Sequence, residues 1–167
     1  MHTKIKVYRY DPELSEAPHY DTYTLDLPDR ATVLEGLVQI RDYVDGTLSL
    51  RCSCRSAICG SCGMRINNKA GLACKTKISS VVNEGEELVV EPMGNMPVIK
   101  DLVSDMSLFW EKLIAITPWL VPAGSPPEKE YIVSNEQMIK LTDAMNCILC
   151  GACVSDCQSL AIDKNFL

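Results

Sequence analysis

The sequence contains no run of about 18 apolar residues, which is the length that a helix needs to cross a lipid bilayer. We therefore predict that the chain does not span a membrane by itself. Positive charge is also scarce, because 16 Lys and Arg residues stand against 22 Asp and Glu residues, for a net charge of -6. Proteins that bind nucleic acids normally present a basic face to the phosphates, so this balance opposes a nucleic-acid partner.

The sequence also lacks targeting signals and catalytic motifs. Its N-terminal residues MHTKIKVYRYD contain neither the apolar core of a secretory signal nor an Arg- and Ser-rich transit segment. This predicts a reducing cytoplasm, where neighbouring thiols more often bind metal than form disulfides. We find no convincing nucleophile-base pair and no Gly-rich nucleotide loop, so we expect no acid-base chemistry from the side chains.

Cysteine is abundant, and its nine copies form two tight groups, from Cys52 to Cys74 and from Cys147 to Cys157. The first group has the spacing CxxxxCxxC followed by one more distant cysteine, which is typical of plant-type [2Fe-2S] ferredoxins. Thiolates that share one cluster have to converge from a short loop while a distant residue closes the cage. The candidate ligands are Cys54, Cys59, Cys62 and Cys74.

The second group has the spacing CxxCxxCxxxC of bacterial ferredoxins, in which the fourth thiolate serves a different cluster from the first three. Gln158 stands where such runs usually continue with proline. A chain of 167 residues makes one ordinary domain or two small ones, which clusters would help to stabilise. The candidate ligands are Cys147, Cys150, Cys153 and Cys157.

Other metal sites fit the spacing less well. Zinc ribbons bring two CxxC knuckles together, whereas CxxxxCxxC with a lone distant cysteine suits a planar two-iron cluster. A Rieske centre needs two histidines, and His2 and His19 lie far from any cysteine, which excludes it. We interpret Cys52 as a bystander thiol, because Cys54 keeps the CxxxxCxxC spacing.

Hydrophobic periodicity in the N-terminal part predicts a small α+β domain. Alternating apolar residues predict two paired strands around residues 5–7 and 23–27. Helical spacing follows over residues 32–44, with a capping box at its start and Gly46 as its stop. After the first cysteine group, we expect a strand, a turn at 67–71 and another strand, and then a further strand in EELVVEP.

The C-terminal part has mainly helical periodicity. Apolar residues follow helical spacing from Leu102 up to Pro118, and SNEQMIKLTDAMN predicts a second helix that leads into the second cysteine group. We therefore predict an α+β protein with two domains. The first covers residues 1–95 and the second covers residues 96–167.

Four segments of this sequence closely resemble the iron-sulfur subunit of succinate dehydrogenase and fumarate reductase: CRSAICGSCGMRINNKAGLACKT, MPVIKDLVSDMSLFWEKL, PWL and CILCGACVSDC. The resemblance covers nearly the whole chain. It implies an N-terminal β-grasp [2Fe-2S] ferredoxin domain and an α-helical bacterial-type ferredoxin domain. It also implies three clusters in a line between a FAD-containing flavoprotein subunit and a quinone-binding membrane anchor.

The resemblance also implies a cluster for each candidate ligand. Cys147, Cys150 and Cys153 match three ligands of the family's [4Fe-4S] cluster, and Cys157 matches the first ligand of its [3Fe-4S] cluster. The four candidate ligands of the first group match the family's [2Fe-2S] ligands.

The sequence departs from the family beyond Cys157. The family takes its fourth [4Fe-4S] ligand and two further [3Fe-4S] ligands from a downstream helical segment that this sequence lacks. Three explanations stay open: a longer polypeptide, a second chain that contributes cysteines, or a single [4Fe-4S] cluster with Cys157 as its fourth ligand. We prefer the first, because a chain that ended inside a ferredoxin module would leave thiolates without their iron.

The sequence thus predicts the electron-transfer subunit of a succinate:quinone oxidoreductase, peripheral to the cytoplasmic face of a bacterial or archaeal membrane, with the succinate site on another subunit. A second hypothesis is the iron-sulfur subunit of another oxidoreductase, such as a thiol-dependent fumarate reductase or a glycolate oxidase-like complex. A third is a zinc-stabilised interaction module. The segment MPVIKDLVSDMSLFWEKL favours the first hypothesis.

Overall fold

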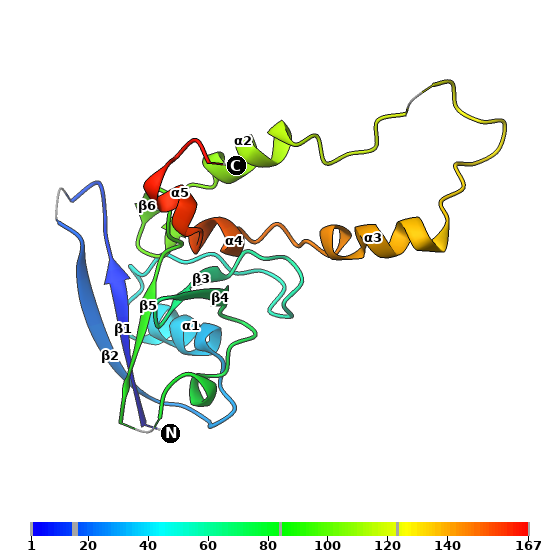
Figure 1. Cartoon of the computed structure of the whole chain (residues 1–167). Helices are drawn as coiled ribbons and strands as arrows, with labels where there is room; N and C mark the ends of the chain where they lie inside the picture. The colour runs from blue at the N-terminus through cyan, green and yellow to red at the C-terminus, as the bar shows by residue number, and fades with distance from the viewer. Residues whose placement is uncertain (1, 15–16, 84, 123, 167) are drawn as a thin grey trace.

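The N-terminal part of the protein is a mixed five-stranded sheet with the strand order β2-β1-β5-β3-β4 (Figure 1). The structure is a computed structural model that describes residues 2–14, 17–83, 85–122 and 124–166. β1 and β5 run parallel, whereas the other neighbouring strands run antiparallel. The strands are β1 (His2–Arg9), β2 (His19–Asp26), β3 (Gly63–Ile66), β4 (Lys69–Leu72) and β5 (Glu87–Glu91).

Helix α1 (Val33–Tyr43) packs on the sheet and encloses the main hydrophobic core with it. Its predicted capping box is confirmed, because the Thr32 side chain accepts from the Glu35 N–H while the Glu35 carboxylate accepts from the Thr32 N–H. The prediction that Gly46 stops the helix is wrong, since α1 ends at Tyr43 with Val44 as its C-cap. The fully enclosed side chains include Ile5, Val7, Val33, Leu37, Ile40, Met64, Ile78, Leu88 and Val90.

The hairpin of β3 and β4 has a shorter turn than the sequence suggested. β3 ends at Ile66 and β4 begins at Lys69, so only Asn67 and Asn68 form the turn. Both have positive φ, at 48° and 65°, which asparagine tolerates better than most residues and which two-residue hairpin turns require. A short 3-10 helix, η1 (Ile78–Ser80), lies between β4 and β5.

The helix predicted from Leu102 begins later than expected. β6 (Val98–Lys100) and β7 (Val103–Ser104) form a small two-stranded sheet first, and α2 spans only Ser107–Ala115. Asp101 has a φ of 45°, which a right-handed helix cannot contain, and Leu102 is buried in the N-terminal core. Long-range packing therefore overrides the local helical periodicity here, and the predicted division at residue 95 stays a prediction.

The C-terminal helices are small and largely exposed. α3 (Asn135–Met145) begins with the predicted capping box of Ser134 and Gln137, but it has no buried residue and extends away from the sheet (Figure 1). α4 (Ala152–Ser155) and α5 (Gln158–Ile162) return the chain to the end of the sheet. Within the described ranges, no helix is long and apolar enough to cross a membrane.

The N-terminal part is held to residues 98–104 by a buried polar network around Arg9. The Arg9 guanidinium donates to Asp101 Oδ1 over 3.1 Å and to Thr47 Oγ1 over 2.7 Å, and it also bonds Asp45 and the Tyr23 hydroxyl. The pKa of Asp45 lies well below its usual range because the hydroxyls of Thr47 and Tyr23 and the Arg9 guanidinium donate to its carboxylate. The network therefore favours the charged form of the Asp45 carboxylate.

Asp101 connects this network to two segments of backbone. Its side chain is 2% exposed, and it accepts the N–H groups of Tyr10 at 3.0 Å and Ser49 at 2.8 Å in addition to the Arg9 bond. A buried carboxylate with this many donors leaves an unpaired charge and unsatisfied N–H groups behind when it is removed.

We expect the substitution Asp101→Asn to lower the free energy of unfolding by about 2 kcal/mol, because it removes the most deeply buried of the carboxylates that face Arg9 and leaves fewer acceptors for the surrounding N–H groups. Asparagine tolerates the positive φ at this position, so the backbone adds little to the loss. Chemical denaturation followed by circular dichroism measures the change. The control is Asp42→Asn, which removes an exposed ion pair with Arg41 and is expected to cost less than about 1 kcal/mol. Equal losses in the two variants would contradict the assigned role of Asp101.

Candidate metal centre

The first cysteine loop follows the core residue Leu48 and ends at β3, and left-handed residues shape it. Arg55, Ala57 and Gly60 have φ values of 55°, 57° and 71°. Residues in this conformation turn neighbouring backbone N–H groups toward one side of a loop, which creates a cavity that favours negative charge. The loop is therefore built to face an anionic group.

The N–H groups of this loop point at thiol sulfur atoms. Cys54 Sγ accepts the N–H groups of Ser56 and Ile58 at 3.4 Å and that of Cys59 at 3.3 Å. Cys74 Sγ accepts the N–H of Ala57 at 3.3 Å. Such donors stabilise the negative charge of a thiolate, and they tune an iron-sulfur cluster when one is bound.

The four candidate ligands of the first group come together as two pairs. The Cys54 side chain helps to lower the pKa of Cys59, and the Cys74 side chain helps to raise the pKa of Cys62. The pKa of Cys59 falls to about 6, chiefly because the Ser61 hydroxyl lies 3.1 Å from its sulfur, whereas burial raises the pKa of Cys62 to about 11. In the described part of the chain, no three His, Cys, Asp or Glu side chains form a site for a single metal ion.

This arrangement fits a cluster better than a lone ion. Zinc needs four ligands within about 2.3 Å of one point, whereas two bridged irons spread their thiolates over a wider cage. A two-iron cluster needs two thiolates at each end. The more exposed pair, Cys54 and Cys59, matches one end, and the more deeply buried pair, Cys62 and Cys74, matches the other. The donor set of the first group therefore fits a [2Fe-2S] cluster.

Cys52 lies outside both pairs. It packs against the main hydrophobic core and interacts with the Arg41 side chain. Its thiol therefore has a structural environment that does not involve the other cysteines, which agrees with its interpretation as a bystander.

The cysteines of the second group are held separately rather than in pairs. Cys147 Sγ accepts the N–H of Leu149 at 3.4 Å, and Cys157 Sγ accepts the N–H of Leu160 at 3.4 Å, where Cys157 caps α5. Leu149 and Gly151 have φ values of 57° and 77°, so this loop resembles the first in its backbone. Cys147 and Cys153 are exposed, while Cys150 and Cys157 are half-buried.

The two cysteine loops touch through their backbones at Gly60. A Cβ atom on Gly60 would lie 2.9 Å from both Cα and Cβ of Cys150 and 2.9 Å from the carbonyl oxygen of Ile148. A Cβ atom on Gly63 would lie 3.1 Å from the Cys150 carbonyl oxygen. The first loop therefore approaches the second loop as closely as the chain permits, and only residues without side chains allow it.

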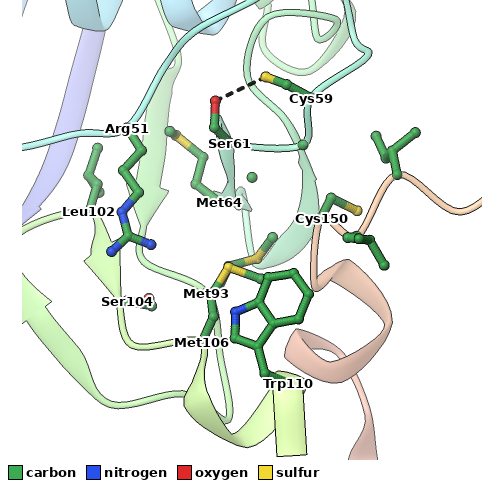
Figure 2. A pocket seen from close by; sticks show the side chains of 14 residues that line it. Arg51, Cys59, Ser61, Met64, Met93, Leu102, Ser104, Met106, Trp110 and Cys150 are labelled. Atoms are coloured by element: carbon green, nitrogen blue, oxygen red, sulfur yellow. Dashed lines mark hydrogen bonds between the residues drawn. The ribbon is translucent and has the colours of Figure 1, made fainter. Parts of the chain in front are cut away.

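An apolar cavity of about 300 Å³ lies beside this contact and is lined by Cys59 of the first loop and Cys150 of the second. Figure 2 shows that Met93 and Trp110 face it from below Cys150, while Met64 faces it from the side of the sheet. Thioether and indole groups bind water poorly, whereas the Arg51 side chain adds a positive charge to the lining of this space.

The sequence located every cysteine but assigned no role to the Ser61 hydroxyl or to Asn95. Ser61 and Gly60 carry a visible signal, since small residues between ligands let the backbone or a hydroxyl approach sulfur. Asn95 binds the second loop over a long sequence distance, and a single sequence provides no signal for that contact.

Comparison with known proteins shows the family to which this chain belongs. Residues 4–111 match the family model of the 2Fe-2S iron-sulfur cluster binding domain. The chain is 42% identical over 165 residues to the fumarate reductase iron-sulfur subunit of Mycobacterium tuberculosis, and 39% identical over 175 residues to that of Haemophilus influenzae. The chain belongs to the family of iron-sulfur subunits of fumarate reductase and succinate dehydrogenase.

Other members of the family agree with this assignment. The mitochondrial succinate dehydrogenase iron-sulfur subunit of Dictyostelium discoideum is 40% identical over 158 residues, which are 92% of this chain and 55% of that protein. A chain in the structure of the Mycobacterium smegmatis Sdh1 complex superposes with a TM-score of 0.83 at 28% identity, over 98% of this chain and 66% of that one. The predicted α+β fold, a ferredoxin-like sheet domain followed by a helical part, is thereby confirmed.

The chain is shorter than its relatives. The matches to the two fumarate reductase subunits include 98% of this chain but only 66% and 67% of the relatives. The chain thus spans about two thirds of the length of these relatives.

We expect Gly60→Ala to separate the two cysteine loops, because its methyl group would clash with the backbone of Cys150. The expected loss in the free energy of unfolding is about 3 kcal/mol, from left-handed strain plus overpacking. Gly85→Ala is a matched control, since Gly85 also has a positive φ of 88° but has no atom within 4 Å of its Cβ position. It is expected to lose about 1 kcal/mol.

Amide hydrogen exchange over residues 147–157 provides a second measurement for the Gly60 contact. Exchange in this segment rises in Gly60→Ala and stays unchanged in Gly85→Ala if the contact holds the second loop. Similar exchange in both variants would show that the second loop is held independently of Gly60.

Proposed function

We propose that this chain transfers electrons as the iron-sulfur subunit of a succinate:quinone oxidoreductase. In this role it connects the FAD of a flavoprotein subunit with a quinone at a membrane-anchor subunit, from a peripheral position on the cytoplasmic face of the membrane. The observation that carries the proposal is the contact of the two cysteine loops at Gly60 and Cys150. Family membership supports the reaction class.

At the first loop, we propose that each thiol pair holds one iron of the [2Fe-2S] cluster. The two pairs support this assignment, because Cys54 contributes to the lowered pKa of Cys59 and Cys74 contributes to the raised pKa of Cys62. The match to a cluster-binding domain over residues 4–111 supports the cofactor. When bound, the cluster supplies one-electron oxidation and reduction, which the side chains cannot perform.

The chain's own groups set the conditions for that chemistry. The N–H groups of Ser56, Ile58 and Cys59 donate to Cys54 Sγ and favour the more negative, reduced state. The apolar side chains of Met64, Met93 and Trp110 limit the water in the cavity between the loops. Water therefore screens the interactions of nearby charges with the thiolates less. In this role the protein fixes distance, hydration and potential.

At the second loop, we propose that Cys147, Cys150 and Cys153 hold three corners of a [4Fe-4S] cluster. Cys157 is the first ligand of a [3Fe-4S] cluster or the fourth ligand of the [4Fe-4S] cluster. The bacterial ferredoxin spacing supports this assignment, and the loop amide of Leu149 already donates to Cys147 Sγ.

Residues 1–95 and 96–167 are then the two cluster-bearing domains. The sheet and α1 form the first, and α2 to α5 belong to the second. The buried bond between Arg9 and Asp101 and the Gly60 contact support a fixed distance between them.

Cysteine substitutions test the first cluster. We expect Cys54→Ala to abolish the reduced [2Fe-2S] signal in low-temperature EPR, because one iron loses half of its thiolate ligands. Cys52→Ala is the matched control, and its signal is expected to equal that of the wild type. Iron and acid-labile sulfide are measured on the same anaerobic samples. A signal that survives Cys54→Ala but disappears in Cys52→Ala would reassign the ligand.

The assembly distinguishes this function from its alternatives. Copurification of a FAD subunit with succinate-dependent reduction of a quinone or dye is expected for a succinate:quinone oxidoreductase. Reduction by another donor, such as a thiol or glycolate, would support a different oxidoreductase. Zinc without sulfide, repeated after iron-sulfide reconstitution, would leave only a zinc-stabilised interaction module.

A further inference from the structure

The turn after β5 contacts the second cysteine group through Asn95. Asn95 has a φ of 59°, and it is half-buried between the sheet domain and α4. Its neighbour Gly94 donates its N–H to Ser155 Oγ over 2.9 Å. A Cβ atom on Gly94 would lie 2.7 Å from the Ser155 carbonyl oxygen, so the two backbones are in direct contact.

The Asn95 side chain donates to a cluster of backbone carbonyl groups. Its Nδ2 lies 2.9 Å from the Val154 oxygen, 2.9 Å from the Cys157 oxygen and 3.3 Å from the Ser155 oxygen. An amide nitrogen has two hydrogens, so one of them is shared between acceptors. Lys164 Nζ donates to Asn95 Oδ1 over 3.2 Å, which agrees with this orientation of the amide.

These carbonyl groups lie where α4 ends and α5 begins. The last carbonyl groups of any helix lack intrahelical partners, and a helix as short as α4 has few bonds of its own. The Val154 oxygen also accepts the N–H of Cys157, and the Cys157 oxygen also accepts the N–H of Ala161. Asn95 therefore ties both sides of the Cys157 backbone to the sheet domain.

A second contact holds the same segment but does not reach the cysteine. Asp156 accepts the Ala70 N–H over 2.8 Å and lies 3.9 Å from Arg65 Nε, with a side chain that is 39% exposed. It connects β4 with the end of α4. Only the Asn95 contact, among the described bonds between these two parts, includes a backbone atom of Cys157.

We propose that Asn95 is a positioning residue for Cys157, which it holds in place for cluster binding from the opposite domain. The proposal rests on the proposed function, in which Cys157 is a cluster ligand. The Cys157 thiol direction follows from its backbone, because that backbone also places Sγ within 3.4 Å of the Leu160 N–H. We therefore expect loss of the Asn95 donors to lower the occupancy of the cluster that Cys157 binds more than the occupancy of the [2Fe-2S] cluster.

The test is Asn95→Asp in the cluster-loaded complex that contains the full chain. The carboxylate keeps the size of the side chain and tolerates positive φ, but it places an acceptor against three carbonyl oxygens. The readout is the EPR intensity of the clusters of the second cysteine group divided by the [2Fe-2S] intensity of the same sample. We expect this ratio to fall about tenfold, which corresponds to about 1.4 kcal/mol.

Asn67→Asp is the matched control. Asn67 also has a positive φ, at 48°, and its side chain bonds the Val81 oxygen and the Val89 N–H, each over 2.9 Å within the sheet domain. General destabilisation of the protein lowers the ratio in both variants, whereas positioning of Cys157 lowers it only in Asn95→Asp. If Asn95→Asp does not accumulate, Asn95→Gly removes the donors without adding charge and is expected to lower the ratio in the same way.

The outcomes separate this inference from the proposed function. A wild-type ratio in Asn95→Asp, or an equal fall in Asn67→Asp, overturns the positioning role. Cys157→Ala is measured in parallel. If it reduces the signals while Asn95→Asp does not, Cys157 is a ligand and only the inference about Asn95 fails. If Cys157→Ala leaves every signal unchanged, the proposed ligand role fails, and the inference fails with it.

Discussion

The arrangement of this protein depends on one steric constraint, the close approach of two backbones at residue 60. Gly60 lies between Cys59 and Cys62 of the first loop, and its α-carbon faces the backbone of Cys150. A side chain there would move the second loop outward and open the apolar cavity between the two cysteine groups to water. Gly60 therefore has two roles. Its left-handed conformation helps to shape the first loop, and its lack of a side chain allows the contact between the two loops.

Features that depend on near neighbours in the chain were predictable from sequence. The strands of the sheet, both capping boxes and the two cysteine spacings each result from interactions within a few residues. The resemblance to a known family then supplied the cofactors, which periodicity alone does not define.

Features that depend on distant contacts were not predictable. The segment after Lys100 has helical periodicity, but Arg9 and Asp101 hold it in a turn from a strand far away in the sequence. The end of α1 was also predicted wrongly, because Val44 rather than a glycine forms the C-cap. Asn95 is an ordinary polar residue in the sequence, and only the fold brings its side chain to the backbone of Cys157.

Helix α3 shows what the absence of tertiary contact means for part of a fold. It is an 11-residue helix without a buried residue, held by its capping box and by an exposed ion pair between Glu136 and Lys140. Isolated helices of this length are marginal in water, because nucleation is costly and few bonds follow it. A helix held in this way is expected to unfold locally at a lower free energy than the sheet, which keeps its structure when α3 opens.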